Sequence, residues 1–346
     1  MASIANLPAA GGLGDEVALT PFGTAPLPVF VQPRVEALRA DIGALADWFR
    51  TNRPALDQLL VDAGAIVLRG FAVEDTAAFG RVVDCFAPTD FGYLAGASPR
   101  AQLAPRVFEA TSAPAEAVLG MHQEMAYLPN YPSRIAFYCR MPSVTGGETY
   151  LADMRAVTRE IPAAFLAAVR ERGVLYTRNF RAPQVSTGHP VLDVFHKTWT
   201  DAFSTADPGK AIADCAAMGL QGSWLDDGSL SVAYRAPGLI DHPVSGECLW
   251  FNQIATQTLN RQNTGDRFAL YERHYGSTRP RPYLTTYGDG GAIPEDFVAA
   301  LYPILSRNTV AFPWSHGDIL LIDNFRTAHG RNAFTGLRDV QVALLN

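Results

Sequence analysis

Several features that would define other classes of protein are scarce or missing in this sequence. The 346 residues include only four cysteines, at positions 85, 139, 215 and 248. These lie far apart and form no CxxC pair, so the sequence predicts neither a zinc ribbon nor a disulfide framework. No apolar run is long enough to span a bilayer, and the N-terminus lacks the basic and apolar regions of a secretory signal. These absences favour a cytoplasmic protein with reduced thiols.

Basic residues are also fewer than acidic residues. Lys and Arg together number 28 against 34 Asp and Glu, which gives a net charge of −6. No block of the sequence is strongly basic, so we expect no nucleic-acid partner. Hydrophobic residues make up 48%, and 29 Gly and 24 Pro are spread along the chain. This composition is typical of a globular, loop-rich protein that can bury a core.

The order of the expected elements favours a mainly β protein. Residues 1–33 are rich in Gly, Pro and Ala and predict an N-terminal arm, followed by one domain over residues 34–346. Apolar runs predict strands, which include 65–71, 134–139, 173–179, 230–235, 248–252, 309–312, 318–323 and 340–345. Helical spacing recurs from residue 34 to 49 and after Asp75, and again in stretches at about 153–171, 207–218, 262–274 and 295–305. Because strands and helices do not alternate regularly, we expect an α+β fold built on a jelly roll, the double-stranded β-helix, with helical decorations.

Two irregular segments are expected to act as lids. Residues 87–121 and 181–205 are long, punctuated by Pro or Gly and weakly periodic. Long loops in compact domains are usually functional. Closure of such segments would shield a reactive centre from water.

A short motif carries the clearest chemistry. His122 and Glu124 are two residues apart, so on a strand they would point to the same face. His329 offers a third ligand near the C-terminus. Two histidines and one carboxylate leave half of an octahedral metal sphere open, as in non-haem Fe(II) oxygenases. The His-x-Glu triplet alone is weak, because it arises by chance and a histidine among apolar residues is more often part of a core.

Longer blocks of sequence strengthen this interpretation. They are YLAGASPR (93–100), HQEMAYLPNYPSRIAFYC (122–139), GGET (146–149), HPVSGECLWFNQ (242–253) and DNFRTAHGRNAFTGLR (323–338). In this order and spacing they resemble the taurine dioxygenase family of iron- and 2-oxoglutarate-dependent oxygenases. Within it, the sequence is most similar to the SyrP-like branch, which hydroxylates amino acids in peptide natural-product pathways.

The resemblance implies a set of site residues and cofactors. The Fe(II) ligands would be His122, Glu124 and His329, with 2-oxoglutarate and O2 as co-substrates. Thr149 and Arg338 would bind the 2-oxoglutarate carboxylates, Arg338 through a bidentate fork. The matched blocks also nominate four residues for the substrate pocket, namely Arg100, Phe251, Asn252 and Arg331. Asp323 and Asn324 are expected to support the ligands or form a turn, and the other histidines to be structural or exposed.

Two departures bear on the reaction. Glu124 stands where many family members have Asp and where related halogenases have a small residue, which favours hydroxylation over halogenation. Val342 stands where taurine-type enzymes carry a second arginine that grips the sulfonate, so a sulfonate substrate is disfavoured. The resemblance points instead to an amino acid, free or tethered to a carrier protein, and is compatible with a homo-oligomer.

The sequence leaves several alternatives open. Desaturation, cyclisation or epoxidation need the same cofactors as hydroxylation and differ in how the substrate is held. A zinc hydrolase would use the same three ligands without O2. A jelly-roll binding protein without turnover is the alternative outside enzymology.

Overall fold

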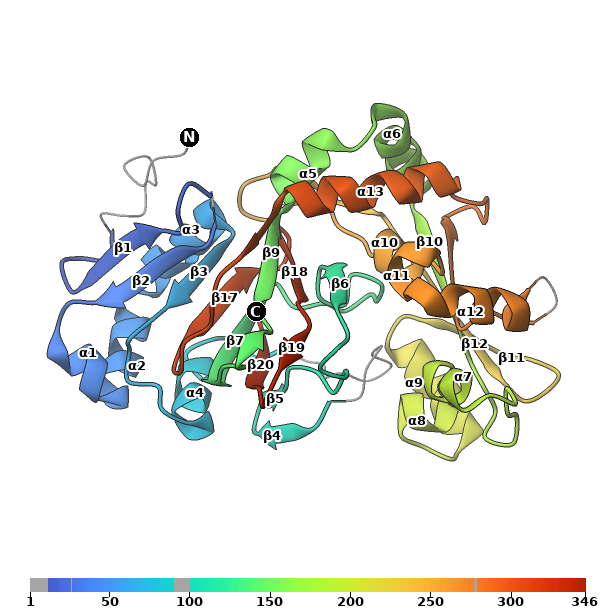
Figure 1. The fold of residues 1–346 in the computed structure, drawn as a ribbon, viewed down its shortest axis with the longest axis horizontal. Helices are drawn as coiled ribbons and strands as arrows, with labels where there is room; N and C mark the ends of the chain where they lie inside the picture. The colour runs from blue at the N-terminus through green and yellow to red at the C-terminus, as the bar shows by residue number, and fades with distance from the viewer. Residues whose placement is uncertain (1–11, 26, 90–99, 277–278) are drawn as a thin grey trace.

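The computed structural model describes residues 12–25, 27–89, 100–276 and 279–346. Its centre is a pair of β-sheets whose inner faces share one apolar core (Figure 1). The larger sheet has the strand order β1-β2-β3-β17-β7-β20-β5-β4, with bounds Val17–Pro21, Val29–Pro33, Ala65–Leu68, Ile319–Asp323, Arg134–Met141, Asp339–Leu345, Val107–Glu109 and Gln102–Ala104. The smaller sheet has the order β16-β9-β18-β6, with bounds Thr309–Ala311, Thr149–Asp153, Thr327–Arg331 and Leu119–His122. This pair is the jelly roll that the sequence predicts.

The middle strands of the larger sheet are buried on both faces. β17 reads Ile-Leu-Leu-Ile-Asp and is buried along its whole length. Leu320 and Ile322 point into the space between the two sheets and pack with Leu151 of β9. Ile319 and Leu321 belong to the core on the opposite face. A strand between two apolar layers carries no polar side, so it reads as a continuous apolar run.

Four helices pack on the outer face of the larger sheet. They are α1 (Glu36–Ala40), α2 (Ile42–Thr51), α3 (Arg53–Ala63) and α4 (Thr76–Val83). The carboxylates of Asp41 and Asp75 accept hydrogen bonds from the backbone N–H groups of Gly43 (2.6 Å) and Ala78 (2.8 Å). These contacts pair amide groups that the start of a helix leaves without a partner.

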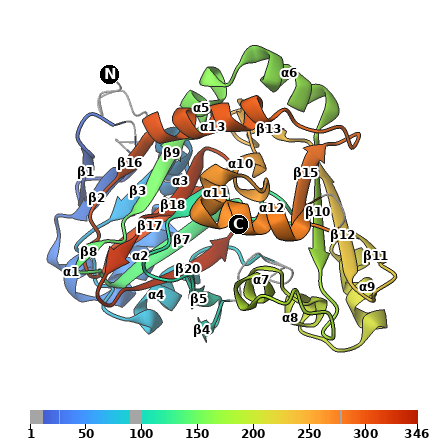
Figure 2. The same ribbon diagram turned by 45° about the vertical axis from the view of Figure 1, so that its right-hand side comes forward.

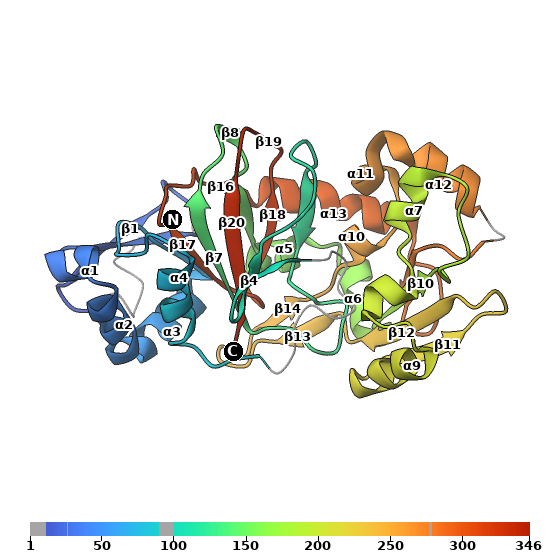
Figure 3. The same cartoon turned by 90° about the horizontal axis from the view of Figure 1, so that it is seen from below.

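A third sheet and most of the remaining helices lie beside the jelly roll (Figure 2). Its strand order is β11-β12-β10-β15, with bounds Gln221–Trp224, Leu230–Ala236, Val174–Phe180 and Tyr283–Tyr287. The helices are α5 (Met154–Glu160), α6 (Ala163–Arg172), α7 (Pro190–Phe195), α8 (Trp199–Phe203), α9 (Pro208–Ala217), α10 (Ile254–Gln257), α11 (Arg261–Thr264), the 3-10 helix η3 (Gly265–Arg267), α12 (Phe268–Tyr275) and α13 (Glu295–Arg307). Two short pairs complete the fold, namely β13 (Leu239–Asp241) with β14 (Cys248–Trp250) and β8 (Thr145–Gly146) with β19 (Phe334–Thr335). Seen from below, the third sheet extends the molecule along its long axis (Figure 3).

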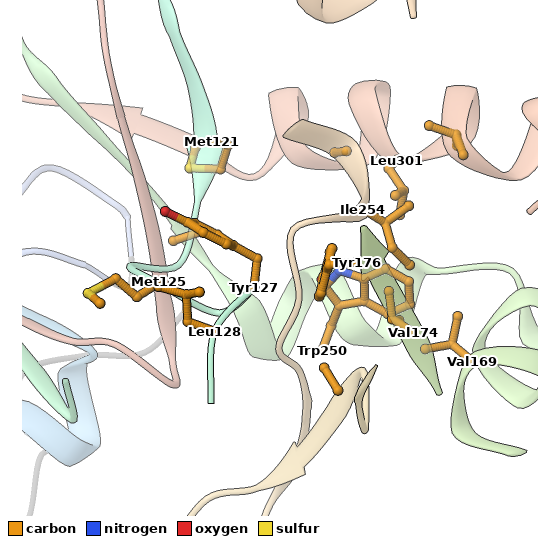
Figure 4. Packing of buried hydrophobic residues seen from close by; sticks show 14 of the residues in the cluster. Met121, Met125, Tyr127, Leu128, Val169, Val174, Tyr176, Trp250, Ile254 and Leu301 are labelled. Atoms are coloured by element: carbon orange, nitrogen blue, oxygen red, sulfur yellow. The ribbon is translucent and has the colours of Figure 1, made fainter. Parts of the chain in front are cut away.

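One apolar cluster joins the third sheet to the jelly roll. Tyr176 of β10 and Trp250 of β14 lie close together in this cluster, below Ile254 of α10 (Figure 4). Met121 of β6 belongs to the same cluster, as does Leu301 of α13. The outer face of the smaller sheet is therefore buried, and β6 packs through Met121 against this cluster.

The structure differs from the sequence prediction at the N-terminus. The predicted arm over residues 1–33 contains two strands in its described part, since β1 pairs antiparallel with β2 and β2 runs parallel to β3. Val29 and Val31 are buried there. The Gly- and Pro-rich composition of this segment did not predict strands. Their pairing with β3, more than thirty residues away, cannot be read from the local sequence.

The two predicted lid segments carry short regular elements. Residues 87–121 include β4, β5 and most of β6, and their part from 90 to 99 lies outside the described residues. Residues 181–205 include α7 and α8. No helix in the described ranges has both the length and the apolar character needed to cross a bilayer.

Candidate active site

Strands β6 and β18 bring two histidines together. Their antiparallel register pairs His122 with His329, and the ring centroids are 4.4 Å apart. Arg331 pairs with Leu119, where an uninterrupted ladder would put Gly120, so β6 contains one extra residue. A bulge of this kind bends a strand and redirects its side chains. The Gly120 carbonyl accepts a hydrogen bond from Nδ1 of His122 (2.8 Å), which leaves the Nε2 lone pair for a metal.

Gly330 lets the two strands approach closely. A Cβ atom at this position would lie 2.5 Å from the carbonyl oxygen of Leu119 and closer still to the ring of Tyr150. Real Cβ atoms do not tolerate such a contact with backbone, so only glycine fits here. This glycine directly follows His329, and the strand spacing that it permits sets the distance between the two imidazoles.

Glu124 lies in a turn and not on the strand, which corrects the sequence argument. β6 ends at His122, and Met125 has a φ of 58°, so the chain reverses there. Asn324 holds the turn: its Oδ1 accepts from the N–H of Glu124 (2.7 Å), and its Nδ2 donates to the carbonyls of Glu124 (3.0 Å) and Pro132 (2.8 Å). The expected closeness of His122 and Glu124 is therefore present, but a buried carboxamide produces it instead of strand geometry.

The three candidate ligands converge on one point. Oε2 of Glu124 is 3.6 Å from Nε2 of His329 and 4.0 Å from Nε2 of His122. One ligand atom from each residue can be chosen so that all three lie within 4.8 Å of one another. Within the described part of the chain, the buried Oε2 has no hydrogen-bond partner. Burial of such an oxygen is unfavourable unless something compensates for it, and a cation among the three atoms would do so.

The charge states suit metal binding. Burial raises the pKa of Glu124, but Arg100 and the two histidines outweigh this effect and lower it to about 2. Burial, followed by repulsion from His329, lowers the pKa of His122 to about 4. At neutral pH, Glu124 is therefore a carboxylate and His122 is neutral, which are the forms that ligate metals.

A cavity of about 40 Å³ opens beside these residues. Six of the predicted site residues line it, namely Arg100, His122, Thr149, His329, Arg331 and Arg338. Arg338 donates from Nε to the Gly147 carbonyl (2.9 Å), and burial together with the nearby Arg331 lowers its pKa to about 10. Guanidinium groups that are close together and poorly solvated favour an anion between them.

Arg331 lines the cavity, but its guanidinium contacts backbone. Nη1 donates to the carbonyl of Ala113 (3.1 Å), and Nη2 donates to those of Pro114 and Ala117 (both 2.6 Å). Arg331 therefore fastens residues 113–117 to β18, two positions after His329.

The other two predicted substrate residues are not at the cavity wall formed by these six. Phe251 packs against Tyr131 (ring centroids 4.7 Å apart) and Phe325 (5.5 Å) in a small buried cluster. Asn252 donates to the carbonyl of Gly238 (2.7 Å) and is 5% exposed. The contacts of Phe251 are those of a packing residue, whereas Asn252 also lines, together with His122, a second cavity of about 20 Å³.

Two supporting interactions were not foreseen in detail. Nε2 of His242 donates to Oδ2 of Asp323 (2.9 Å), and Oδ1 of Asp323 accepts from the N–H of Phe325 (2.9 Å). This buried pair shapes the turn that leads from β17 into β18. The other interaction is the contact of Asn324 with Glu124. Its only signal in the sequence was that Asn324 lies in the same matched block as His329.

Comparison with known proteins identifies the family. A family model described as "Taurine catabolism dioxygenase TauD, TfdA family" matches residues 24–344. The chain belongs to this family. This dioxygenase is 29% identical over 315 residues to the dapdiamide synthesis protein DdaC of Enterobacter agglomerans, covering 91% of this chain and 92% of DdaC. It is 28% identical over 330 residues to a clavaminate synthase-like protein of Arabidopsis thaliana, covering 93% and 94% of the two chains.

Solved structures show the same fold. The PvcB protein of Pseudomonas aeruginosa is 17% identical and covers 96% of this dioxygenase and 92% of its own chain, with a TM-score of 0.52. A taurine dioxygenase of Burkholderia xenovorans is 13% identical and covers 95% and 89%, with a TM-score of 0.51. These likenesses confirm the jelly-roll architecture.

Family membership establishes the class of enzyme. This dioxygenase depends on iron and 2-oxoglutarate and uses O2 as its other co-substrate. The zinc hydrolase and the binding protein without turnover are thereby set aside. The SyrP-like branch stays a prediction.

Proposed function

We propose that this dioxygenase hydroxylates an unactivated C–H bond of an amino acid or an amino-acid-derived substrate, with iron held by His122, Glu124 and His329. The observation that carries the proposal is the buried Oε2 of Glu124, which faces Nε2 of both histidines and has no hydrogen-bond partner among the described residues. The overall reaction consumes substrate, 2-oxoglutarate and O2 and yields alcohol, succinate and CO2. One oxygen atom of O2 enters the alcohol and the other enters succinate.

The donor set fits ferrous iron. Two imidazoles and one carboxylate on one side of a metal leave room for a chelating co-substrate and for O2. Bound iron supplies the activation of O2 that oxidation of a C–H bond requires. The protein keeps Glu124 ionised through Arg100 and fixes the His122 tautomer through the Gly120 carbonyl.

For 2-oxoglutarate we propose Thr149 and Arg338. The hydrogen bond to Gly147 uses Nε of Arg338, so its two Nη atoms can form a fork to a carboxylate. A bound dianion would also offset the electrostatic repulsion between Arg338 and Arg331. The cavity has a volume of about 40 Å³, which is small for a five-carbon dianion, so we expect its walls to open for the co-substrate. Movement of the described part of the predicted lid 87–121, which supplies Arg100, Ala110 and Leu119 to the cavity wall, would serve this. The predicted lid 181–205 supplies none of the lining residues of this cavity.

The substrate assignment rests on three points. The relative DdaC is named for the synthesis of dapdiamide, which supports a biosynthetic role here. Val342 is fully buried in β20, so the position of the second arginine of taurine-type enzymes offers no cation. The carboxylate of Glu124 fills the place that halogenases leave for a halide. We therefore expect hydroxylation of an amino acid, either free or attached to a carrier protein.

A coupled assay tests the proposal. Enzyme, Fe(II) and 2-oxoglutarate are incubated under air with a panel of amino acids, free and carrier-bound, and succinate and substrate products are followed by mass spectrometry. The expected result is one succinate for each product that has gained the mass of one oxygen atom, with no turnover without O2. Products that have lost two hydrogens, or turnover in the absence of O2, would contradict hydroxylation.

Variants test the residue roles. His122→Ala should abolish metal binding and turnover. Arg338→Ala should mainly raise the 2-oxoglutarate concentration needed for half-maximal rate, by about 10–100-fold, because hydrogen bonds from a charged group contribute about 1.5–3 kcal/mol. Arg140→Ala, at a side chain that is 52% exposed, is the matched control and should behave as wild type. Equal tolerance of the first two changes would contradict the assignment.

A further inference from the structure

The two carboxylate oxygens of Glu124 have different surroundings. Oε2 faces Nε2 of His122 and of His329, whereas Oε1 is 3.5 Å from Nη2 of Arg100. The side chains of Arg100 and Glu124 are 12% and 6% exposed, so this ion pair is largely shielded from water. Asn324 fixes the backbone of Glu124 and leaves the carboxylate to be oriented by its other neighbours.

The orientation of this carboxylate decides how many metal positions stay open. A carboxylate can bind a metal through one oxygen or through both. With two imidazoles and one carboxylate oxygen, half of an octahedral sphere remains for a two-oxygen chelate and O2. A second bond from Glu124 would remove one of these positions. Glutamate also has one more rotatable bond than aspartate, so its carboxylate needs a restraint to stay in one orientation.

We propose that Arg100 is a positioning residue that holds Oε1 of Glu124, so that Glu124 binds the metal through Oε2 alone. This role rests on the proposed metal site and replaces the predicted contact of Arg100 with substrate. The pairing is charge-assisted, and the forked guanidinium can restrain the plane of a carboxylate in a way that a neutral donor cannot. Without it, Oε1 can rotate toward the metal, and 2-oxoglutarate then competes with Glu124 for one coordination position.

The number of open metal positions can be measured directly. Mn(II) is bound to the metal-free enzyme without 2-oxoglutarate, and the enhancement of water-proton relaxation gives the number of exchangeable metal-bound waters. Wild type should hold about three waters and Arg100→Gln about two, since the second carboxylate oxygen displaces one. Arg100→Lys, which keeps a cation, should restore the count in large part. Arg140→Gln removes an exposed arginine–carboxylate pair (2.9 Å) elsewhere and should keep the wild-type count.

A second measurement separates positioning from simple charge. Removal of a cation near a metal should by itself tighten Mn(II) binding, whatever the geometry of Glu124. In the Glu124→Ala background that effect remains, but Arg100→Gln should no longer change the number of waters.

The possible outcomes fall into distinct groups. An unchanged water count in Arg100→Gln would overturn the role, and an accompanying rise in KM for substrate would identify Arg100 as a substrate contact. If wild type failed to bind Mn(II), the metal site and this role would both be wrong. If wild type bound Mn(II) with its full set of waters but no 2-oxoglutarate, the proposed function would fail while the role of Arg100 could still be read from the variants.

Discussion

Replacing Asn324 by alanine removes a buried carboxamide that serves three backbone groups at once. The N–H and carbonyl of Glu124 and the carbonyl of Pro132 each lose a hydrogen bond of 2.7–3.0 Å. Asn324 is 0% exposed, so water cannot readily replace it. We expect the turn that carries Glu124 to loosen and the protein to lose stability.

The size of the effect follows from the number of groups left unpaired. A buried polar group without a partner costs about 1–3 kcal/mol, so three groups at the low end give about 3 kcal/mol of unfolding free energy. Because Glu124 would no longer be held beside the two histidines, metal affinity should fall by about 10–100-fold, as is typical for residues that orient ligands.

Urea unfolding of the metal-free protein, followed by tryptophan fluorescence, measures the first quantity, and calorimetric titration with Mn(II) measures the second. Asn324→Asp keeps the shape and the acceptor for Glu124 N–H but loses both donated bonds, so it should also be destabilised. Asn308→Ala is the control, since its carboxamide donates to Ile304 O (2.9 Å) near the surface and water can replace it. Wild-type unfolding midpoints and wild-type Mn(II) affinity in both Asn324 variants would refute the reasoning.

Three further predictions concern other parts of the molecule. Burial lowers the pKa of His196 to about 4, so between about pH 6.5 and 4 only the unfolded chain binds this proton. The free energy of unfolding should therefore decrease as the pH is lowered through that window, by up to about 3 kcal/mol. His196→Gln should flatten this loss in urea unfolding, whereas His316→Gln, at an exposed position, should not; identical profiles would contradict the argument. Arg331→Gln should speed amide hydrogen exchange at residues 113–117 by at least about tenfold, because each lost charged hydrogen bond contributes about 1.5–3 kcal/mol; unchanged exchange would show that other contacts hold the segment. A chelator should lower the unfolding temperature of the Mn(II)-loaded wild type but not of His329→Ala, since only a bound metal stabilises the folded state; an equal shift in both would remove His329 from the ligand set.

The predicted strands include fully buried ones and others, such as β10 and β12, whose residues alternate between buried and partly exposed positions. The fully buried strands β9 and β18 were not predicted. β17 and residues 135–139 of β7 read as apolar runs because both of their faces are buried. β1 and β2 were missed because their stabilisation comes from pairing with each other and with β3, which local composition does not reveal. Local signals therefore found the centre of the larger sheet but not its edge.

The candidate site divides in the same way. The closeness of His122, Glu124 and His329 was predicted from residue types and from the family resemblance. The turn at Glu124 was not, because it depends on a contact with Asn324, two hundred positions away. Arg331 was expected to contact substrate, yet its partners are carbonyl groups, which are present in every residue and leave no mark in a sequence.

The register between β6 and β18 also bears on how the enzyme is made in the cell. His122 and His329 are cross-strand neighbours although 329 − 122 = 207 residues separate them. Contacts of such long range form slowly, because a large loop must close first. A growing polypeptide on the ribosome would have no complete set of metal ligands until residue 329 had been synthesised and paired with β6, so iron uptake should follow folding and not guide it. Cells that lack iron would then accumulate folded, inactive protein that can bind iron when iron becomes available.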